Sequence, residues 1–397
     1  MVAHASIARH GGYLQNHRLI LRVAFAGANV FAWILAFQYF YVLTSNIRYA
    51  FVDVVLLYTL SHDVTLLLTP FAARGVRSSV KRLMVLGTLC AAGAFVFLGA
   101  SFAGFFGRDL YWGVLGFSML LALYRALYWV PYEIEAHTHP SLREKGTMWR
   151  EMLVALVPML GGLLLAGGYQ AVRWLLFGAA ALLLSSLVPL SKLGDVYENF
   201  SWSYAETFRQ LFTFANRRMV GISILNGMQG AALLLMWPIA VFLIVNWSYG
   251  MLGIVLAVTF LLALLARRLY RSFILHAHLE QSRIIPAAVG ISGWLMRLSV
   301  ASPFGVALVD TFFYTATPAR SIGVDQLVFE QSADGGSYVD EYTALKEISL
   351  ALGRIFICLF AAVLALAYSL PMTLAIVFIL AALATGWSVY LSREAMR

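Results

Sequence analysis

The sequence LYWGVLGFSMLLALYRALYWV, residues 110–130, is apolar along its length and carries a single charge, Arg125. A polar turn follows at residues 131–146, and a second apolar run starts at Met152. About 20 apolar residues in a helix span the roughly 30 Å hydrocarbon core of a bilayer. Two such runs joined by a polar turn therefore predict a transmembrane helical hairpin, with an ionisable group part-way along its first helix.

The whole chain has the composition of a membrane protein. Of its 397 residues, 61% are hydrophobic and 12% are charged, and the mean hydropathy is +0.80. A soluble domain carries about 25% charged residues. The two cysteines, Cys90 and Cys358, both lie in apolar runs and indicate neither a disulfide framework nor a metal site. The composition predicts an all-α polytopic membrane protein.

Twelve apolar segments recur along the chain, each long enough for a membrane span. We place them at residues 19–45, 50–70, 82–105, 110–135, 147–168, 171–191, 218–246, 250–269, 284–301, 304–326, 343–368 and 371–391. Most of the connections between them are short, so we expect consecutive helices to be antiparallel neighbours.

Basic residues mark one side of this arrangement. The connections on the side of the N-terminus carry most of the Lys and Arg residues outside the spans, whereas the opposite connections carry only Arg48, Arg108 and Arg173. Positively charged loops stay in the cytoplasm, which predicts an inner-membrane protein with both termini cytoplasmic. Because this topology also accounts for the net charge of +9, we expect no nucleic-acid partner.

Residues 193–217 differ from the other connections. The stretch is longer, polar and rich in aromatic residues, which predicts an amphipathic cytoplasmic linker lying as a helix on the membrane surface. It separates six spans from six, so we expect a bundle at residues 1–192 and a second at residues 218–397. Landmarks such as Tyr49 and Tyr249 recur at an offset of 200 residues, which favours two pseudo-symmetric bundles.

Twelve spans in a 6+6 layout, with cytoplasmic ends and a basic loop after the second span, resemble the major facilitator superfamily. Residues 70–82, PFAARGVRSSVKR, correspond to that family's loop Gly-x-Leu-Ala-Asp-Arg-x-Gly-Arg-Arg and keep its basic residues, with Ala73 near the position of its acid. Arg125 matches the family's fourth-span arginine. Residues 157–162, VPMLGG, look like the Gly-Pro-x-x-Gly-Gly of proton-driven exporters. The resemblance implies a central cavity lined by spans 1, 4, 7 and 10, and alternating access by rocking of the halves.

Arg125 is the first candidate for a functional site. A charge near the bilayer centre costs several kcal/mol unless it faces protein or water. Tyr128, Trp129 and Tyr132 follow it at helical spacing and place an aromatic wall on the same face. We expect Arg125 to anchor a substrate carboxylate or phosphate, or to take part in a proton relay. The alternative is a structural ion pair inside the bundle.

His62 and Asp63 lie near the middle of the second span. Adjacent residues on a helix point about 100° apart, so only one of them faces the cavity squarely. Asp63 is the preferred candidate, either as the carboxylate that binds the coupling proton or as the counter-charge to Arg125. An interhelical packing pair is the alternative.

Arg297 and Asp310 fall at similar depth in the ninth and tenth spans, and Tyr314 shares a face with Asp310. We expect Arg297 and Asp310 to form an ion pair that acts either as a gate or as a static brace. In the fifth span, we expect Pro158, Gly161 and Gly162 to bend the helix and to pack closely.

Several polar residues have weaker assignments. Glu151 and Glu347 lie near the inner ends of the fifth and eleventh spans, where we expect contacts with loop arginines, and Arg354 lies two turns after Glu347. Three amides in the first and seventh spans either bind substrate or hold helices together. These amides are Asn29, Asn226 and Gln229.

A cluster of acidic and histidine residues after the fourth span resembles a metal site by composition. It comprises Glu133, Glu135, His137 and His139. The cluster lies at the membrane boundary between two prolines, without cysteine, so we expect a solvated stretch and no metal.

The sequence therefore predicts a secondary active transporter that moves a small organic solute, an amphiphile or an organic anion, by alternating access. We expect proton coupling, with export favoured over uptake, and a monomer in contact with membrane lipids. A lipid flippase on the same scaffold is the alternative. We expect no enzyme and no cofactor, because no nucleophile–base–orienter set or metal triad occurs at recognisable spacing. Nucleotide-driven transport is disfavoured because no Gly-x-x-x-x-Gly-Lys-Ser/Thr segment is present.

Overall fold

A computed structural model describes residues 2–107, 110–138, 148–276, 284–316 and 339–394. Every regular element within these residues is a helix. The elements before residue 193 are α1 (Val2–Thr44), α2 (Ile47–Gly75), α3 (Val80–Phe102), α4 (Tyr111–Thr138), α5 (Met148–Leu165), α6 (Tyr169–Ser185) and α7 (Leu187–Ser191). Those after it are α8 (Tyr204–Arg209), η2 (Gln210–Phe212), α9 (Arg217–Ala231), η3 (Ala232–Met236), α10 (Trp237–Ile244), α11 (Tyr249–His276), α12 (Ile284–Met296), η4 (Arg297–Ser299), α13 (Pro303–Ala316), α15 (Val339–Ala367) and α16 (Leu370–Glu394).

Helices occupy the position of each span predicted from the sequence. Ten of them are long and apolar enough to cross a membrane, counted within the described residues. The other two, at Ile284–Ser299 and Pro303–Ala316, are shorter there. Residues 317–326 of the predicted tenth span lie outside the described part of the chain. The prediction of an all-α polytopic membrane protein is confirmed.

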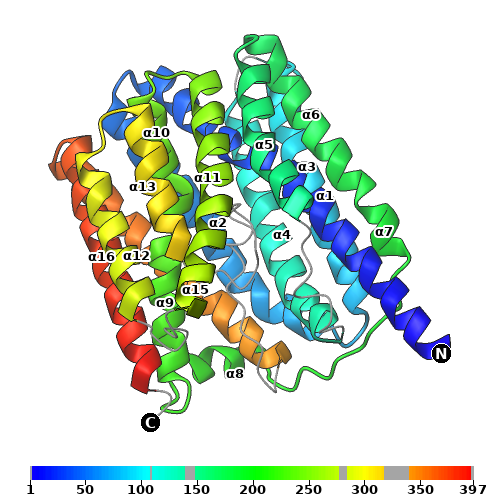
Figure 1. The fold of residues 1–397 in the computed structure, drawn as a ribbon. Coiled ribbons are helices and arrows are strands. Elements are labelled where there is room, and N and C mark those ends of the chain that lie inside the picture. The colour runs from blue at the N-terminus through cyan, green and yellow to red at the C-terminus, as the bar shows by residue number, and fades with distance from the viewer. Residues whose placement is uncertain (1, 108–109, 139–147, 277–283, 317–338, 395–397) are drawn as a thin grey trace.

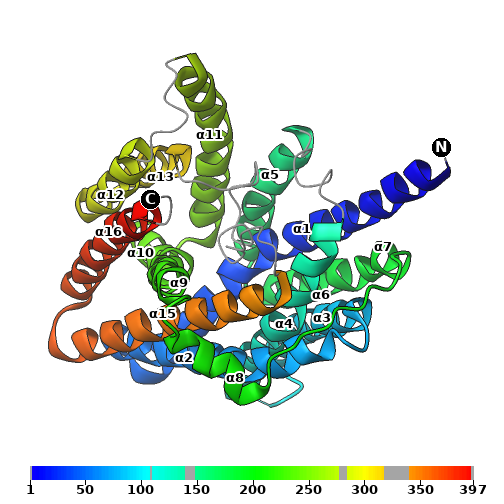
Figure 2. The same cartoon turned by 90° about the horizontal axis from the view of Figure 1, so that it is seen from below.

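The helices stand side by side in one bundle, and both termini lie at the same end of it (Figure 1). Seen along the bundle, α3, α6 and α7 lie on one side and α12, α13 and α16 on the other (Figure 2). Elements from before and after residue 193 meet along two main contacts, α2 against α15 and α5 against α11. The exact domain boundaries and the pseudo-symmetry of the halves stay predictions.

The segment between α7 and α8 is not the amphipathic helix that its composition predicts. Residues 194–203 form no helix, and the helical part is confined to α8 and the short turn η2. The extended backbone is held instead by the start of α3 and the residue before it. The N–H of Val80 donates to the carbonyl of Val196 at 3.1 Å, and the hydroxyl of Ser79 donates to the Asp195 carboxylate at 2.7 Å. Pairing with these distant residues has outweighed the local helical pattern.

The predicted seventh span is interrupted by a π-helical turn, η3, between α9 and α10. Pro238, the second residue of α10, has no N–H to donate to the preceding turn, and its ring crowds the carbonyl there. Such an insertion relieves the clash and often occurs at functional positions. Here it places Trp237 and Pro238 against the central cavity described below.

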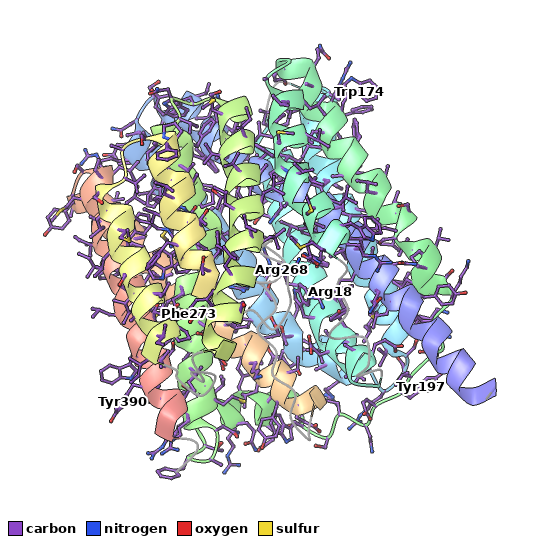
Figure 3. All side chains as sticks on the ribbon, in the orientation of Figure 1. Arg18, Trp174, Tyr197, Arg268, Phe273 and Tyr390 are labelled. Carbon is purple, nitrogen blue, oxygen red and sulfur yellow. The ribbon has the colours of Figure 1, made fainter. Side chains whose placement is uncertain are left out.

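Large aromatic residues project from the outside of the bundle (Figure 3). Trp174 lies at the end away from the termini, and Tyr197 and Tyr390 lie toward the opposite end; all three are more than half exposed. Trp and Tyr are enriched where a membrane meets water. Their positions agree with a bundle that spans a bilayer along its long direction.

Candidate functional site

Arg125 lies inside the bundle, between α4 and α2. Its side chain is only 3% exposed, and Nη1 donates to the Ser61 hydroxyl at 2.9 Å. The guanidinium also lies 5.8 Å from the centre of the Tyr58 ring. The Ser61 hydroxyl donates onward to the carbonyl of Ser118 in α4, which fixes the orientation of the acceptor. The arginine predicted from the sequence is therefore buried in protein.

His62 follows Ser61 on α2 and is fully buried. Neither of its ring nitrogens has a hydrogen-bond partner, and its ring packs against that of Tyr58 at 4.5 Å between centroids. Two guanidinium groups, those of Arg125 and Arg354, lie within electrostatic range of it. A buried imidazole without partners costs free energy, since both of its nitrogens have given up water.

Arg354 approaches the same place from α15. Its side chain is 3% exposed, and its Nε and Nη2 atoms have no hydrogen-bond partner. Within the described residues it forms no ion pair. An uncompensated buried cation costs several kcal/mol. Arg125, His62 and Arg354, here named the cationic cluster, thus lie together at the junction of α2, α4 and α15, and an anion would neutralise the charge of Arg354.

Asp63 does not join this cationic cluster. It lies on the same face of α2 as Leu56, Leu60 and Leu67, each of which is more than 40% exposed, because positions 56, 60, 63 and 67 follow the helical repeat. The burial of His62 turns its neighbour outward. The structure therefore assigns the inward position to His62 rather than to the preferred candidate, Asp63.

The aromatic wall of α4 faces α1 instead of surrounding Arg125. Tyr128, Trp129 and Tyr132 are all buried, and the rings of Tyr128 and Tyr132 stack at 5.5 Å. The Tyr128 hydroxyl hydrogen-bonds Nε2 of His17 at 3.0 Å, and the Tyr132 hydroxyl accepts from Arg18 at 2.7 Å. These tyrosines connect α4 to α1 and lie about one and two turns after Arg125 on α4.

Glu151 forms a buried ion pair with Arg22 of α1, at 2.8 Å and 2.6 Å for the two hydrogen bonds. The expected contact with a cytoplasmic loop arginine is wrong, because Arg22 lies within the first span. Neither Arg22 nor His17 was predicted as a site residue from the sequence. Arg22 carried the same signal as Arg125, a charge inside an apolar run, whereas His17 lies in a polar segment and carried no such signal.

The acidic residues after Pro131 are also buried. Helix α4 continues through Pro131, and Glu133 and Glu135 are 3% and 2% exposed, so the expectation of a solvated stretch is wrong for these two. The side chain of His137 and residue His139 lie outside the described part of the chain. No group of three or more metal-ligating side chains occurs within the described residues.

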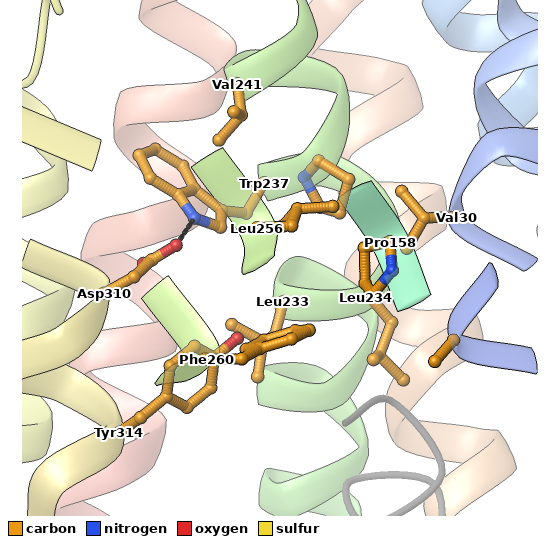
Figure 4. A pocket seen from close by; sticks show the side chains of 12 residues that line it. Val30, Pro158, Leu233, Leu234, Trp237, Val241, Leu256, Phe260, Asp310 and Tyr314 are labelled. Atoms are coloured by element: carbon orange, nitrogen blue, oxygen red, sulfur yellow. Dashed lines mark hydrogen bonds between the residues drawn. The ribbon is translucent and has the colours of Figure 1, made fainter. Parts of the chain in front are cut away.

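A small cavity of about 30 Å³ lies among α1, α5, η3, α10, α11 and α13. Its volume is enough for about one or two water molecules. Asp310 and Tyr314 reach it from α13, Trp237 borders it beside Asp310, and Pro158 closes it on the side of α5 (Figure 4). The pairing of Asp310 and Tyr314 on one face, predicted from spacing, is present.

Arg297 and Asp310 form the ion pair that their depth predicted. The closest nitrogen–oxygen distance is 2.7 Å, and the Trp237 indole donates to the other carboxylate oxygen at 2.7 Å. The Arg297 guanidinium also lies 4.3 Å and 4.2 Å from the ring centres of Trp294 and Phe313. This packing joins α10, α12 and α13; whether the pair also acts as a gate stays a prediction.

Helix α5 packs closely against two other helices through its paired glycines. A Cβ atom on Gly161 would lie 2.5 Å from the Gly27 carbonyl oxygen of α1, and one on Gly162 would lie 2.9 Å from the Gly253 Cα of α11. Only glycine permits backbones to approach this closely. Pro158, inside α5, contacts the same crossing, because a Cβ on Gly253 would meet its carbonyl oxygen. The predicted close packing is present.

The remaining polar candidates hold different positions. Gln229 accepts a hydrogen bond from Thr385 at 2.7 Å, so it connects α9 to α16. Asn29 is buried in α1, whereas Asn226 is half-buried in α9. Glu347 is buried on α15, two turns before Arg354. Substrate contact for these residues stays a prediction.

No family model matches the sequence, and no curated protein matches it. Solved structures do match. A POT family transporter crystallised with 5-aminolevulinic acid superimposes with a TM-score of 0.65 and 11% identity, covering 98% of this chain and 97% of that one. The nucleoside transporter NupG matches with a TM-score of 0.55 and 13% identity, covering 97% and 98%. The chain has the fold of the major facilitator superfamily.

The resemblance to the major facilitator superfamily that the sequence indicated is thus confirmed for the fold. Identities this low carry no residue roles from one protein to the other. In this major facilitator fold, the cationic cluster therefore has to be interpreted from its own chemistry. Arg354 differs from Arg22 and Arg297, each of which is already neutralised by a carboxylate, Glu151 and Asp310 respectively.

We expect Arg22→Met to destabilise the protein by about 3–5 kcal/mol, because it leaves the Glu151 carboxylate buried without its partner. The double variant Arg22→Met/Glu151→Met should recover most of that loss, since no charge then remains. Thermal unfolding of the purified proteins in detergent measures both. Arg82→Met, which changes an exposed arginine, is the control and should change the stability by about 0.5 kcal/mol or less. Equal destabilisation in the single and double variants would contradict this account.

Proposed function

We propose that this chain is a secondary transporter that moves a small organic anion across the membrane by alternating access. The observation that supports it is the cationic cluster, in which Arg354 has no ion-pair partner. In the transport cycle, the anion would bind between Arg354 and Arg125 and supply the missing negative charge. The Ser61 hydroxyl holds one guanidinium in place for that role.

Two further findings support transport of a solute. The POT family transporter named above was crystallised with an acid, and another with a thioalcohol-conjugated peptide at a TM-score of 0.64. Arg125 and Arg354 are each only 3% exposed, so neither lies on an open groove at the lipid surface. Of the two substrate classes that the sequence left open, the buried charge favours the anion over the amphiphile. It also favours a solute transporter over a lipid flippase.

The close crossings of α5 with α1 and α11 support a rocking movement. Backbones packed through glycine slide with little side-chain rearrangement, so Gly161, Gly162 and Gly253 form a suitable pivot. The central cavity would open on one side of this pivot as the contacts on the other side close. We retain export as the proposed direction because of the resemblance of residues 157–162 to the segment of proton-driven exporters.

Arg354→Gln tests the anion site. We expect a panel of small organic acids, each paired with its neutral amide, to contain acids that raise the unfolding temperature of the wild-type protein, because a ligand stabilises the state that it binds. Their amides should have little effect. In Arg354→Gln the acids should lose this stabilisation, worth about 2.7 kcal/mol at a hundredfold excess over Kd.

The matched control for this measurement is Arg268→Gln, since Arg268 is exposed on α11 and should respond as the wild type does. Loss of counterflow transport of the same acid in proteoliposomes should accompany the loss of binding in Arg354→Gln. Full stabilisation of Arg354→Gln by the acids, or equal stabilisation of the wild type by acids and amides, would exclude an anion at the cationic cluster.

We propose that coupling to protons uses Glu151 rather than Asp63. Protonation of Glu151 would remove the negative charge of a buried pair and release Arg22, which would loosen the contact between α1 and α5. Asp63 has no charged partner within the described residues, so its protonation would change no contact between helices.

We therefore expect Glu151→Gln to exchange substrate across proteoliposomes but to lose accumulation driven by a pH gradient. Asp63→Asn should retain both activities. The measurement is uptake of a labelled acid identified by the binding panel, with and without an imposed gradient. If Asp63→Asn lost gradient-driven accumulation while Glu151→Gln retained it, the coupling residue would be Asp63, as the sequence alone favoured.

A further inference from the structure

A second and much larger cavity, of about 560 Å³, is lined in part by Asn46, Ile47 and Arg48, where α1 leads into α2. That turn lies at the end of the bundle away from the termini (Figure 1). It is bordered by the start of α2, by α10, by η4 and by the start of α16. Ligand sites for drug-sized molecules occupy about 300–1,000 Å³. The cavity is therefore large enough for a small molecule or one acyl chain.

The walls of this cavity are apolar at depth and more polar toward solvent. Trp237, Leu374 and Phe378 are each more than 90% buried. Ser369 and Pro371, in the turn before and at the start of α16, are exposed. The cavity thus has an apolar interior and an accessible rim, which suits a ligand with one apolar part and one polar end.

Both charged residues that line the cavity are arginines, Arg48 and Arg297, and none of the described residues that line it is a carboxylate. Arg48 is half-buried at the start of α2, and its side chain makes no hydrogen bond or ion pair within the described residues. Arg297 binds Asp310, but its Nη1 atom remains without a hydrogen-bond partner although the side chain is fully buried. The charges that line this cavity are complementary to an anion.

The start of α2 adds to the positive potential at the rim. Asn46 caps this helix with its side-chain oxygen on the N–H of Arg48 at 2.9 Å, and Asn46 lines the cavity too. The N-terminal end of a helix favours negative charge. Arg48 and the N-terminal end of α2 therefore both attract an acidic head group to the same edge of the cavity.

We propose that this cavity binds a single-chain anionic amphiphile, with its acidic head group at Arg48 and its acyl chain along Trp237, Leu374 and Phe378. The site is distinct from the cationic cluster between α2, α4 and α15 and does not depend on the proposed transport function. Because Arg48 of α2 precedes residue 193 whereas α10 and α16 follow it, the head group and the acyl chain of the bound ligand would contact different parts of the bundle. A fatty acid and a single-chain phosphate ester share the required chemistry.

The test uses the full-length protein in nanodiscs of phosphatidylcholine, with radiolabelled dodecanoate as the probe. We expect saturable binding of about one dodecanoate per chain, superimposed on linear partitioning into the lipid. Ala375→Trp should abolish the saturable part, because Ala375 lines the cavity and the indole would fill it without removing any polar contact. Ile379→Trp, one turn further along α16 on an exposed face outside the cavity, is the control and should bind as the wild type does.

A second variant tests the charge. Arg48→Gln should weaken dodecanoate binding about tenfold, as expected for the loss of one charge-assisted hydrogen bond, and should leave displacement by 1-dodecanol unchanged. Dodecyl phosphate competes with dodecanoate if a phosphate head group fits, and its failure to compete would restrict the ligand to carboxylates. Absence of saturable binding would overturn the proposal. So would equal binding by Ala375→Trp and the wild type, or equal weakening of acid and alcohol by Arg48→Gln.

Discussion

A guanidinium buried in a membrane protein has to be neutralised or it destabilises the fold. Two of the buried arginines satisfy this condition within the chain, Arg22 with Glu151 and Arg297 with Asp310. Arg354 does not, since its Nε and Nη2 atoms have no partner and no carboxylate contacts it in the described part of the chain. The unpaired charge of Arg354 therefore destabilises the protein at the junction of α2, α4 and α15. A ligand that supplies the negative charge would recover this free energy on binding.

The same constraint explains how binding could be linked to movement. The cationic cluster uses side chains from α2 and α4 on one side and from α15 on the other, so an anion bound there would hold together parts of the chain on both sides of residue 193. The crossings through Gly161, Gly162 and Gly253 allow the parts to shift against each other. In alternating access by this chain, an anion at the cationic cluster would select one arrangement of the helices, and the glycine crossings would allow the change between arrangements.

The fold was predictable because hydropathy and helical length alone determine where a chain crosses a bilayer. The direction in which each helix faces was harder to predict. Lipid and protein interior are equally apolar, so hydropathy could not tell that His62 points inward while Asp63 points outward on α2. Arg297 and Asp310 were paired correctly because they follow one another in adjacent spans at matching depth.

Partners distant in sequence escaped prediction for a related reason. The pair of Arg22 and Glu151 joins residues 129 positions apart, and the extended backbone around Val196 depends on the start of α3. Neither contact leaves a local pattern in the sequence. The burial of Glu133 and Glu135 was missed because these residues fall at the predicted membrane boundary between two prolines, whereas α4 continues through Pro131 and packs them inside the protein.

The most direct measurement of the central claim is anomalous diffraction from crystals of the protein soaked in bromide. Bromide is a general probe for an uncompensated positive charge and needs no knowledge of the substrate. The account predicts an anomalous peak beside the Arg354 guanidinium, close to His62, and none at the carboxylate-paired Arg22. A carboxylate in contact with Arg354, or bromide absent from that position while bound elsewhere in the bundle, would contradict the account.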